Sequence, residues 1–557
     1  MAKRKLLHLL LTAACVTLLN LPARAEKNPV VPKWQRFELT LKSSVAYANP
    51  LQDAEMRVLF VSPLGETNRV YGFWDGGKTW RVRFQPGFPG RWTYYTMCSD
   101  TANQGLHAQT GEFLCSATKG ESRLDLHGPL QVARDQQHLE HADRTPFLWL
   151  GDAAWSAATK STPAEWEEFV QTRAAQKFNV VQWRLNPDSR DAKKAAFTGR
   201  DRIVVNLELF RQLDAKIAAA NRAGLLCAIA PLWEISDRID DQLPEDQAIC
   251  LLRYAAARWG ADDVAWIVAF ECDSTGAQAT RWQNIGRAVF NQVSHAPVIL
   301  LPGESVWVLD AFRRERWVDV LGIQTTAVAN ENSLPWLLNG PLVLEREKNP
   351  TKPLLTIAPP AEVTATPVSG QTTSELSRRL LWWSLLLNTP AGVSYQAQDV
   401  ADWTATPTQG KAAWRQALSL NGASAIAPMA ELFAEKDFWR LEPFSKSLGT
   451  QPGLTSAPLQ VVAASTEAHD YTVVYTPESR TVDLTPTKLP ARLKATWYNP
   501  RTGENAPAPA ANRNAASLSF TAPATGDWLL VLHKLAERAL VAEAKKPAPK
   551  IDKRPRD

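Results

Sequence analysis

The sequence predicts a multidomain α/β protein, with a central (β/α)8 TIM barrel flanked by an N-terminal and a C-terminal β-sandwich domain. Between residues 145 and 440, short apolar runs alternate with helical patterns, as strands and helices alternate in such a barrel. The regions before and after contain only short β-branched and aromatic runs separated by turn residues. The chain has 557 residues and is 45% apolar, so it is globular and long enough for about three to four domains.

Residues 1–25 have the features of a secretory signal peptide. A basic start, MAKRK, precedes a short apolar run, and Ala23-Arg24-Ala25 fits a small-x-small cleavage site. We expect the protein to be exported, to the periplasm or the medium, with no transmembrane segment left after cleavage.

Residues 26–120 are expected to form the N-terminal β-sandwich. Strand-like runs cover 36–44, 55–63, 70–84 and 91–99, and Asp75-Gly76 marks a hairpin. Cys98 and Cys115 lie in neighbouring runs, and an exported protein permits disulfides, so we expect a possible disulfide between them. Cleavage of the signal peptide leaves five cysteines, so at least one thiol has no partner within the chain.

Residues 121–445 are assigned to the barrel. Its eight expected strands are apolar on both faces, as parallel barrel strands are; they cover 146–155, 179–186, 225–234, 264–273, 296–305, 318–326, 352–362 and 391–398. Helical patterns follow five of them, at 163–176, 206–224, 246–260, 279–294 and 374–388, the first with Thr162 as N-cap.

Residues 446–536 return to short strands and are expected to form the second β-sandwich, followed by a disordered basic tail at 537–557. The net charge is +5, but residues 1–25 carry +4 and residues 541–557 carry +3, which leaves the body near −2. Such a body argues against a nucleic-acid partner. No spacing resembles a metal site, no cofactor is expected, and the sequence does not indicate the oligomeric state.

Active sites of such barrels lie at the carboxyl ends of the strands, so the residues there are the candidates for function. The acids Glu271 and Asp273 end the fourth strand, and Glu362 ends the seventh. The expected substrate-binding residues around this rim are Asp152, Trp155, Trp183, Trp233, Glu234, Gln324, Tyr395, Asp399 and Trp403.

Acids, amides and tryptophans on one rim suit glycoside hydrolysis. One carboxylic acid protonates the leaving oxygen, and a second carboxylate attacks the sugar or activates water. Tryptophan rings stack on sugars, while amides and acids bind hydroxyls. Glu271 is the favoured acid because an apolar strand delivers it to the rim, whereas Asp152 is as well suited to bracing the barrel as to contacting substrate.

The barrel segments TPFLWLGDAAW, VAWIVAFEC and KPLLTIAPPAE resemble the apiosidase-like family of bacterial glycoside hydrolases. The region VYGFWDGGKTWRVRFQPGFPGRWTY resembles a small β-domain of unknown function often found ahead of such barrels, and ATWYNPRTGE resembles a C-terminal domain of the collagen-binding type. The resemblance implies an acid/base at the end of strand four and a nucleophile at the end of strand seven.

The chain departs from the family pattern at both positions. Ala269, Phe270 and Glu271 align with Gly-Gly-Asp, so a carboxylate is kept, one methylene longer. Ala358 aligns with the nucleophile, and Glu362 follows four residues later, about 13 Å along an extended chain.

Three functions follow from these observations. The first is an exported hydrolase of a polysaccharide or oligosaccharide, with Glu271 as acid/base and Glu362, Asp273 or Glu304 as the second carboxylate. The second is a catalytically lapsed barrel that binds glycans or assembles with surface proteins. The third is a matrix adhesin acting through the C-terminal domain.

Overall fold

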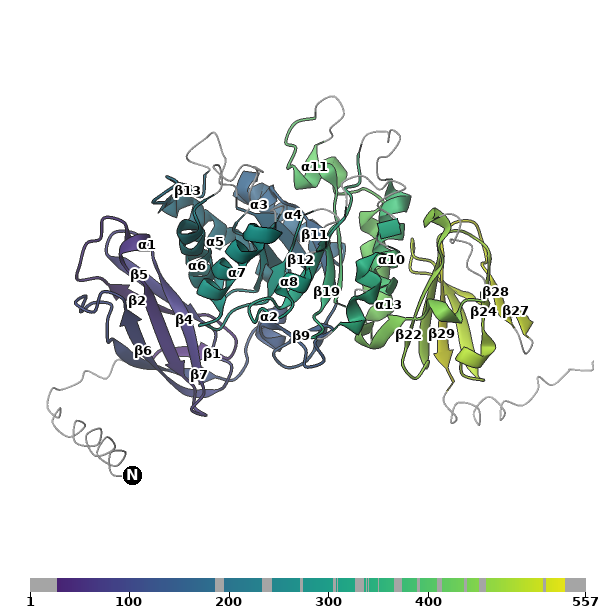
Figure 1. The fold of residues 1–557 in the computed structure, drawn as a ribbon, viewed down its shortest axis with the longest axis horizontal. Helices are drawn as coiled ribbons and strands as arrows, with labels where there is room; N and C mark the ends of the chain where they lie inside the picture. The colour runs from purple at the N-terminus through teal and green to yellow at the C-terminus, as the bar shows by residue number, and fades with distance from the viewer. Residues whose placement is uncertain are drawn as a thin grey trace, which may run out of the picture.

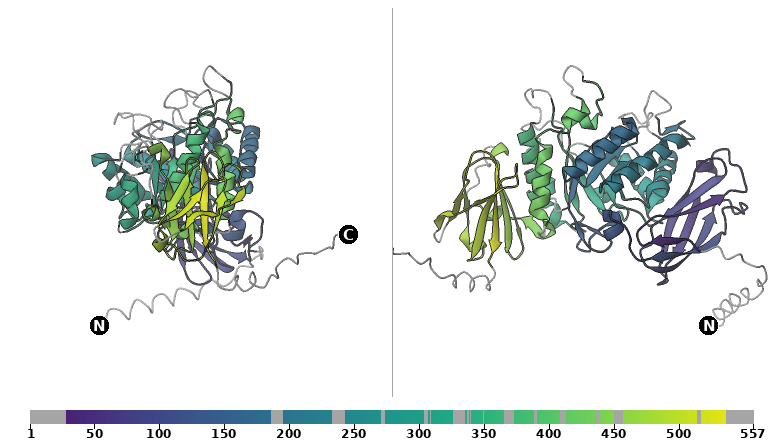
Figure 2. Two further views of the ribbon diagram at one scale, coloured as in Figure 1. Left: turned by 90° about the vertical axis from the view of Figure 1, so that its right-hand side faces the viewer. Right: turned by 180° about the vertical axis from the view of Figure 1, so that it is seen from behind.

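The structure is a computed structural model with three β-rich or α/β regions in a row: an N-terminal sheet, a closed barrel and a C-terminal pair of sheets (Figure 1; Figure 2). The described residues are 28–185, 195–232, 243–270, 274–303, 307, 309–325, 335, 336, 338, 340–348, 350–364, 373–387, 391–407, 413–434, 438–449, 457–513 and 517–535. Within these ranges no helix is long and apolar enough to cross a membrane.

The N-terminal region is one seven-stranded sheet in the order β1-β7-β6-β3-β4-β5-β2. The strands are β1 (Val30–Pro32), β2 (Phe37–Lys42), β3 (Met56–Val61), β4 (Thr67–Trp74), β5 (Thr79–Phe84), β6 (Gly90–Cys98) and β7 (Thr110–Ser116), and a short helix, α1 (Pro50–Asp53), precedes β3. Phe37 of β2 stacks on Phe113 of β7 at 4.1 Å, although these strands lie far apart in the strand order. The sheet therefore curls over an apolar core of its own.

The expected disulfide between Cys98 and Cys115 is wrong. Both residues are buried free thiols. In the ladder between β6 and β7, Cys115 lies opposite Gly90, whereas Cys98 is at the other end of β6. Eight residues of strand separate the two positions, about 26 Å, and a disulfide requires Cα atoms within roughly 7 Å.

The central region is a closed barrel of eight parallel strands, which confirms the predicted barrel. In barrel order these are β11 (Trp149–Ala153), β12 (Val180–Arg184), β15 (Leu226–Ala230), β16 (Val264–Val268), β17 (Val298–Leu300), β18 (Val320–Gln324), β19 (Leu354–Ala358) and β20 (Gly392–Tyr395). A three-stranded sheet, β8 (Leu130–Val132), β9 (Leu139–His141) and β10 (Pro146–Phe147), precedes the first barrel strand, as does α2 (Arg123–His127). A small hairpin of β13 (Phe197–Thr198) and β14 (Val204–Val205) follows β12.

Helices surround the barrel. They are α3 (Ala157–Lys160), α4 (Pro163–Ala175), α5 (Leu207–Arg222), α6 (Glu245–Trp259), α7 (Gly276–Phe290), α8 (Leu309–Phe312), η2 (Pro341–Glu347), α10 (Ser374–Leu387), α11 (Gln398–Ala401), α12 (Trp414–Ala417), η3 (Ala423–Ala425) and α13 (Ile426–Phe433). Five of them, α4, α5, α6, α7 and α10, lie where the sequence predicts helices. Thr162 is the N-cap of α4, as predicted. Its side chain accepts a hydrogen bond from the Glu165 backbone N–H, and the Glu165 carboxylate accepts one from the Thr162 backbone N–H, which forms a capping box.

The C-terminal region contains two sheets that share one apolar core. The larger has β21 (Leu441–Pro443), β22 (Val462–Thr466), β23 (Tyr471–Thr476), β25 (Leu493–Tyr498), β26 (Asn505–Pro507) and β29 (Trp528–Lys534), and the smaller has β24 (Thr481–Leu484), β27 (Ala510–Arg513) and β28 (Leu518–Thr521). It is joined to the barrel by a buried ion pair, in which Arg378 of α10 donates to Asp527 at 2.7 and 3.0 Å.

Buried ion pairs also join the N-terminal sheet to the barrel. Arg83 of β5 donates to Asp214 of α5 at 2.9 Å, and Arg258 of α6 donates to Asp75 at 3.1 Å and to Asp214 at 2.8 Å. These charges neutralise one another, and the Arg258 and Arg83 guanidinium groups, with other hydrogen bonds, hold the pKa of Asp214 below its usual value despite burial.

Candidate active site

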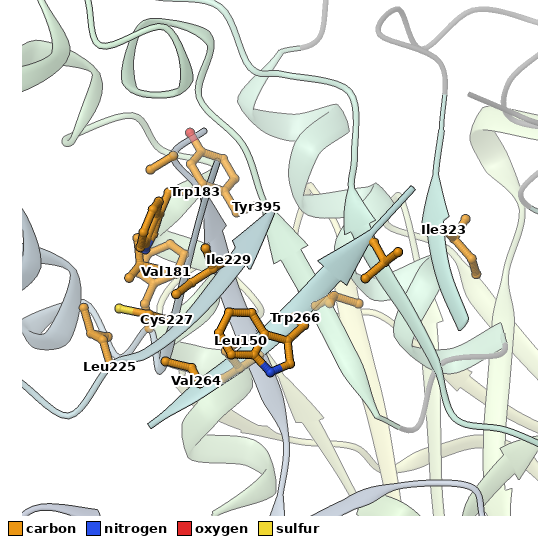
Figure 3. Close-up of a cluster of buried hydrophobic side chains, with 14 of the residues drawn as sticks. Leu150, Val181, Trp183, Leu225, Cys227, Ile229, Val264, Trp266, Ile323 and Tyr395 are labelled. Atoms are coloured by element: carbon orange, nitrogen blue, oxygen red, sulfur yellow. The ribbon is translucent and has the colours of Figure 1, made fainter. Parts of the chain in front are cut away.

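The barrel strands divide their side chains between two apolar clusters. One fills the barrel interior and includes Trp149, Val180 and Ile267. The other lies between the strands and the surrounding helices and includes Val181, Ile229 and Trp266 (Figure 3). Because side chains alternate along a strand, this division decides which strand-end residues can face the barrel mouth.

Two predicted rim residues, Trp183 and Tyr395, belong to the outer cluster, so their prediction as substrate-binding residues is wrong. Trp183 is buried (Figure 3), and its ring lies edge-on to that of Trp259 of α6 at 5.9 Å. Tyr395 is buried too, and its hydroxyl donates to Glu362 Oε2 at 2.7 Å. Both occupy outward positions of their strands, with Gln182 and Ser394 in the inward ones.

Asp152 also faces away from the mouth, which corrects its prediction as a substrate-binding residue. Its side chain is 0% exposed, and its Oδ2 accepts a hydrogen bond from Nε of Arg173 in α4 at 2.6 Å. Burial raises the pKa of Asp152, although the Arg173 charge acts in the opposite direction. Asp152 therefore braces the first strand against the first long helix.

Trp403 is a packing residue rather than a sugar platform, so this prediction is wrong. Its ring stacks on Trp414 at 4.2 Å and meets the edge of Phe169 at 5.6 Å. Asp399 is buried in the first turn of α11, directly after β20, and its role stays a prediction.

Glu362 is not placed to act as the second carboxylate. It is 1% exposed, and its carboxylate accepts hydrogen bonds from the Ser374 hydroxyl, the Tyr395 hydroxyl and the Gly422 backbone. Burial raises its pKa, which these bonds partly offset. A larger residue does not fit at position 422, because a Cβ on Gly422 would lie 2.1 Å from Glu362 Oε2. The carboxylate thus ties α10 and η3 to the barrel.

The mouth itself contains an aromatic and amide cluster that joins three strand ends. Trp155, after β11, stacks on Phe270, after β16, at 4.2 Å. Its indole N–H donates to Oε1 of Gln396, after β20, at 3.3 Å. Trp155 thus lies at the barrel mouth, and its contact with substrate stays a prediction. Phe270 is not among the predicted site residues, although its position directly before Glu271 indicates that it lies at the barrel mouth.

The end of β18 presents two buried polar atoms to this region. Gln324 Oε1 and Thr325 Oγ1 have no hydrogen-bond partner among the described residues. Gln324 lies opposite Ala358 of β19 across an irregular step in the ladder, at an inward position of its strand. A carbonyl oxygen and a hydroxyl in this place can bind a sugar hydroxyl, which supports the prediction for Gln324.

Ala269, the residue between β16 and Phe270, has a positive φ of 63°. This conformation is costly for a residue with a Cβ and occurs where the surrounding structure imposes it, frequently at functional sites. The predicted residues Glu271 and Asp273 come directly after Phe270 and lie outside the described residues, as do Trp233, Glu234 and Glu304.

Comparison with known families gives three matches in chain order. The model "Apiosidase-like, catalytic domain" matches residues 133–440, more than half of the chain. A domain of unknown function, DUF5060, matches residues 30–99, and the model "Putative collagen-binding domain of a collagenase" matches residues 455–533. Comparison with curated proteins finds no match.

Two solved structures similar to this one are described as glycoside hydrolases. A "putative glycoside hydrolase" from Bacteroides vulgatus ATCC 8482 superposes with a TM-score of 0.68 at 17% identity, covering 91% of this chain and 100% of the other. A family 5 glycoside hydrolase from the same organism gives 0.63 at 17% identity, covering 74% and 94%. At this identity the likeness establishes the fold.

Proposed function

The chain belongs to the apiosidase-like family of glycoside hydrolases, and we propose from this that it hydrolyses O-glycosidic bonds of a polysaccharide with two carboxylates at the barrel mouth. Glu271 is the acid/base of this mechanism, and Asp273 or Glu304 supplies the second carboxylate, since Glu362 is enclosed by its own hydrogen bonds.

The observation that carries the proposal is the strained end of the fourth strand. Ala269 holds a conformation that favours glycine, and the next side chain, Phe270, packs against Trp155 at the mouth. The sequence then continues into Glu271. Strain at the carboxyl end of a barrel strand is expected where a catalytic residue is positioned. The unpartnered oxygens of Gln324 and Thr325 provide contacts for sugar hydroxyls.

The test is release of sugar from a panel of plant and microbial polysaccharides by the purified protein. Glu271→Gln keeps the size of the side chain and removes the acid, so turnover should fall by about 10²–10⁴-fold. Glu375→Gln, on the exposed surface of α10, is the matched control and should leave turnover unchanged. A wild-type protein that releases nothing, or a Glu271→Gln variant with full activity, would refute the proposal.

One observation favours a second function, a barrel that binds glycans without cleaving them. Ala358, which aligns with the family's nucleophile, is buried among apolar side chains of the barrel interior, and a methyl group cannot attack a sugar. This function predicts glycan binding without sugar release, with an affinity that Glu271→Gln does not change. Calorimetric titration of the same panel distinguishes the two functions.

The flanking regions and the export signal complete the proposal. The N-terminal and C-terminal regions act as β-sandwich supports for the barrel, and residues 1–25 direct export to the periplasm or the medium. A mature protein whose first residue is Glu26, identified by mass spectrometry outside the cytoplasm, would support export; an intact Met1 would contradict it.

A further inference from the structure

A second cavity, of about 540 Å³, lies at the end of the barrel opposite the candidate active site. Its walls are α2, β9, β10, the segments that lead into β11 and β12, the end of α13 and η4 (Phe438–Arg440). Figure 1 shows α2 and β9 at one end of the barrel and α11, beside the mouth, at the other. The volume falls within the range of sites for small molecules.

Aromatic side chains form much of the wall, namely Phe147, Phe433, Phe438 and Trp439. The indole of Trp439 is half-buried, with the ring of His138 stacked along it at 5.8 Å and the ring of Phe438 edge-on at 5.4 Å. These contacts fix its orientation in the wall. A fixed, partly exposed indole is a surface on which the C–H face of a sugar ring stacks.

A buried acceptor without a partner, His141, lies in the same wall. His141 is 1% exposed, and its Nδ1 donates to the Gly128 carbonyl at 2.7 Å. This bond fixes the tautomer, so Nε2 carries the lone pair, and Nε2 has no partner among the described residues. Burial lowers the pKa of His141 to about 4, so the ring stays neutral at ordinary pH.

A buried donor without a partner lies close by. Arg123 Nη2 donates to the carbonyls of Asn179 and Gly224 at 3.0 and 2.7 Å, while its Nε has no partner among the described residues. Arg123 and His141 flank one ring: the guanidinium lies 4.7 Å from the Phe147 centroid, and the imidazole lies 5.5 Å from it. Sugar hydroxyls suit these two groups, because a hydroxyl can donate to Nε2 of His141 and a hydroxyl can accept from Nε of Arg123.

We propose that this cavity is a secondary carbohydrate-binding site, in which a sugar ring stacks on Trp439 and its hydroxyls bond to His141 and Arg123. The choice of carbohydrate rests on the proposed function, but the site lies away from the mouth and needs no catalysis. Such a site would hold a polysaccharide on the protein while another part of the same polymer occupies the barrel mouth.

The experiment is calorimetric titration of the full-length protein carrying Glu271→Gln, so that no ligand is consumed, with cellotetraose, xylotetraose and mannotetraose as probes. His141→Asn keeps a donor near the Nδ1 position for the Gly128 carbonyl and removes Nε2. It should weaken binding of at least one probe tenfold or more. His295→Asn is the matched control, because Nδ1 of His295 also lies against a backbone carbonyl, that of Ala296 at 3.0 Å, outside this cavity.

Trp439→Phe is the second variant. It removes stacking area and leaves the hydrogen bonds of His141 in place, so it should also weaken probe binding. This variant tests the proposal if His141→Asn does not fold. Equal affinities in these variants and the control, or no binding of any probe, would overturn the proposal and leave a cavity filled by water only. Sugar release by the wild-type protein is measured in a separate assay. A protein that releases no sugar can therefore still show binding at this cavity, and the two failures are distinguishable.

Discussion

The buried ion pair between Asp152 and Arg173 is predicted to hold the first barrel strand against helix α4, and this prediction can be tested directly. Both side chains are 0% exposed, and among the described residues Arg173 forms its ion pair with Asp152, through a hydrogen bond of 2.6 Å. Nη1 of Arg173 also donates to neutral oxygens, those of Gln176 and Leu418, at 2.7 and 3.1 Å. In Asp152→Ala the guanidinium stays buried without its counter-charge, so we expect a loss of about 3–5 kcal/mol in the free energy of unfolding.

The assay is urea-induced unfolding followed by tryptophan fluorescence and near-ultraviolet circular dichroism. The double variant Asp152→Ala, Arg173→Met removes both charges and should recover most of the loss, because no unpaired charge remains buried. If Asp152→Ala lowers the free energy of unfolding by less than about 1 kcal/mol, or if the double variant is no more stable than the single one, the ion pair does not stabilise the barrel as proposed. A raised KM with unchanged stability would instead place Asp152 against the substrate.

Three further predictions test the site and the second cavity. Glu362→Gln should lower the free energy of unfolding by about 1.5–3 kcal/mol, because the groups that donate to Glu362 lose a charged acceptor. Turnover per folded molecule should stay within a few-fold of wild type. A loss of turnover without a loss of stability would make Glu362 a catalytic candidate again. Ala269→Gly should raise the thermal midpoint, since relief of the positive φ is worth about 1 kcal/mol; a lower midpoint would show that the conformation is not strained. The pKa of His141 is about 4 in the folded protein and 6.5 in the unfolded chain. Between these pH values the unfolded chain binds more protons, so the free energy of unfolding should fall by up to about 3 kcal/mol as pH falls from 6.5 to 4. A His141→Asn variant with the same pH dependence of stability as wild type would contradict this.

The barrel could be predicted from sequence because its signals are local. Each strand is a short apolar run, and each long helix has its own apolar periodicity and ends, such as the capping box at Thr162. The order of these elements leaves few alternatives to a closed parallel barrel. The register within the N-terminal sheet carries no such signal, which is why Cys98 and Cys115 were placed close together when they lie at opposite ends of a strand.

The facing of strand-end residues could not be predicted, because the strands are apolar on both sides. Buried parallel strands lack the alternation that marks an inner and an outer face. Asp152, Trp183 and Tyr395 therefore read as mouth residues, although each points into the helix layer. Trp403 was misplaced for a related reason: its partner Trp414 is eleven residues away in sequence, and only tertiary packing brings the rings together.

The ends of strands four and seven differ in what they keep of the family's geometry. At strand four, Ala269 adopts the conformation that the family's glycine would adopt without strain, and the stacking of Phe270 on Trp155, worth about 0.5–1.5 kcal/mol, offsets that strain. At strand seven, Ala358 lies unstrained in the apolar interior, and Glu362 is bound elsewhere. Ala269 has a positive φ at the end of strand four, whereas Ala358 at the end of strand seven does not, and this difference agrees with the proposal that the chemistry is centred on strand four, with Asp273 or Glu304 as the second carboxylate.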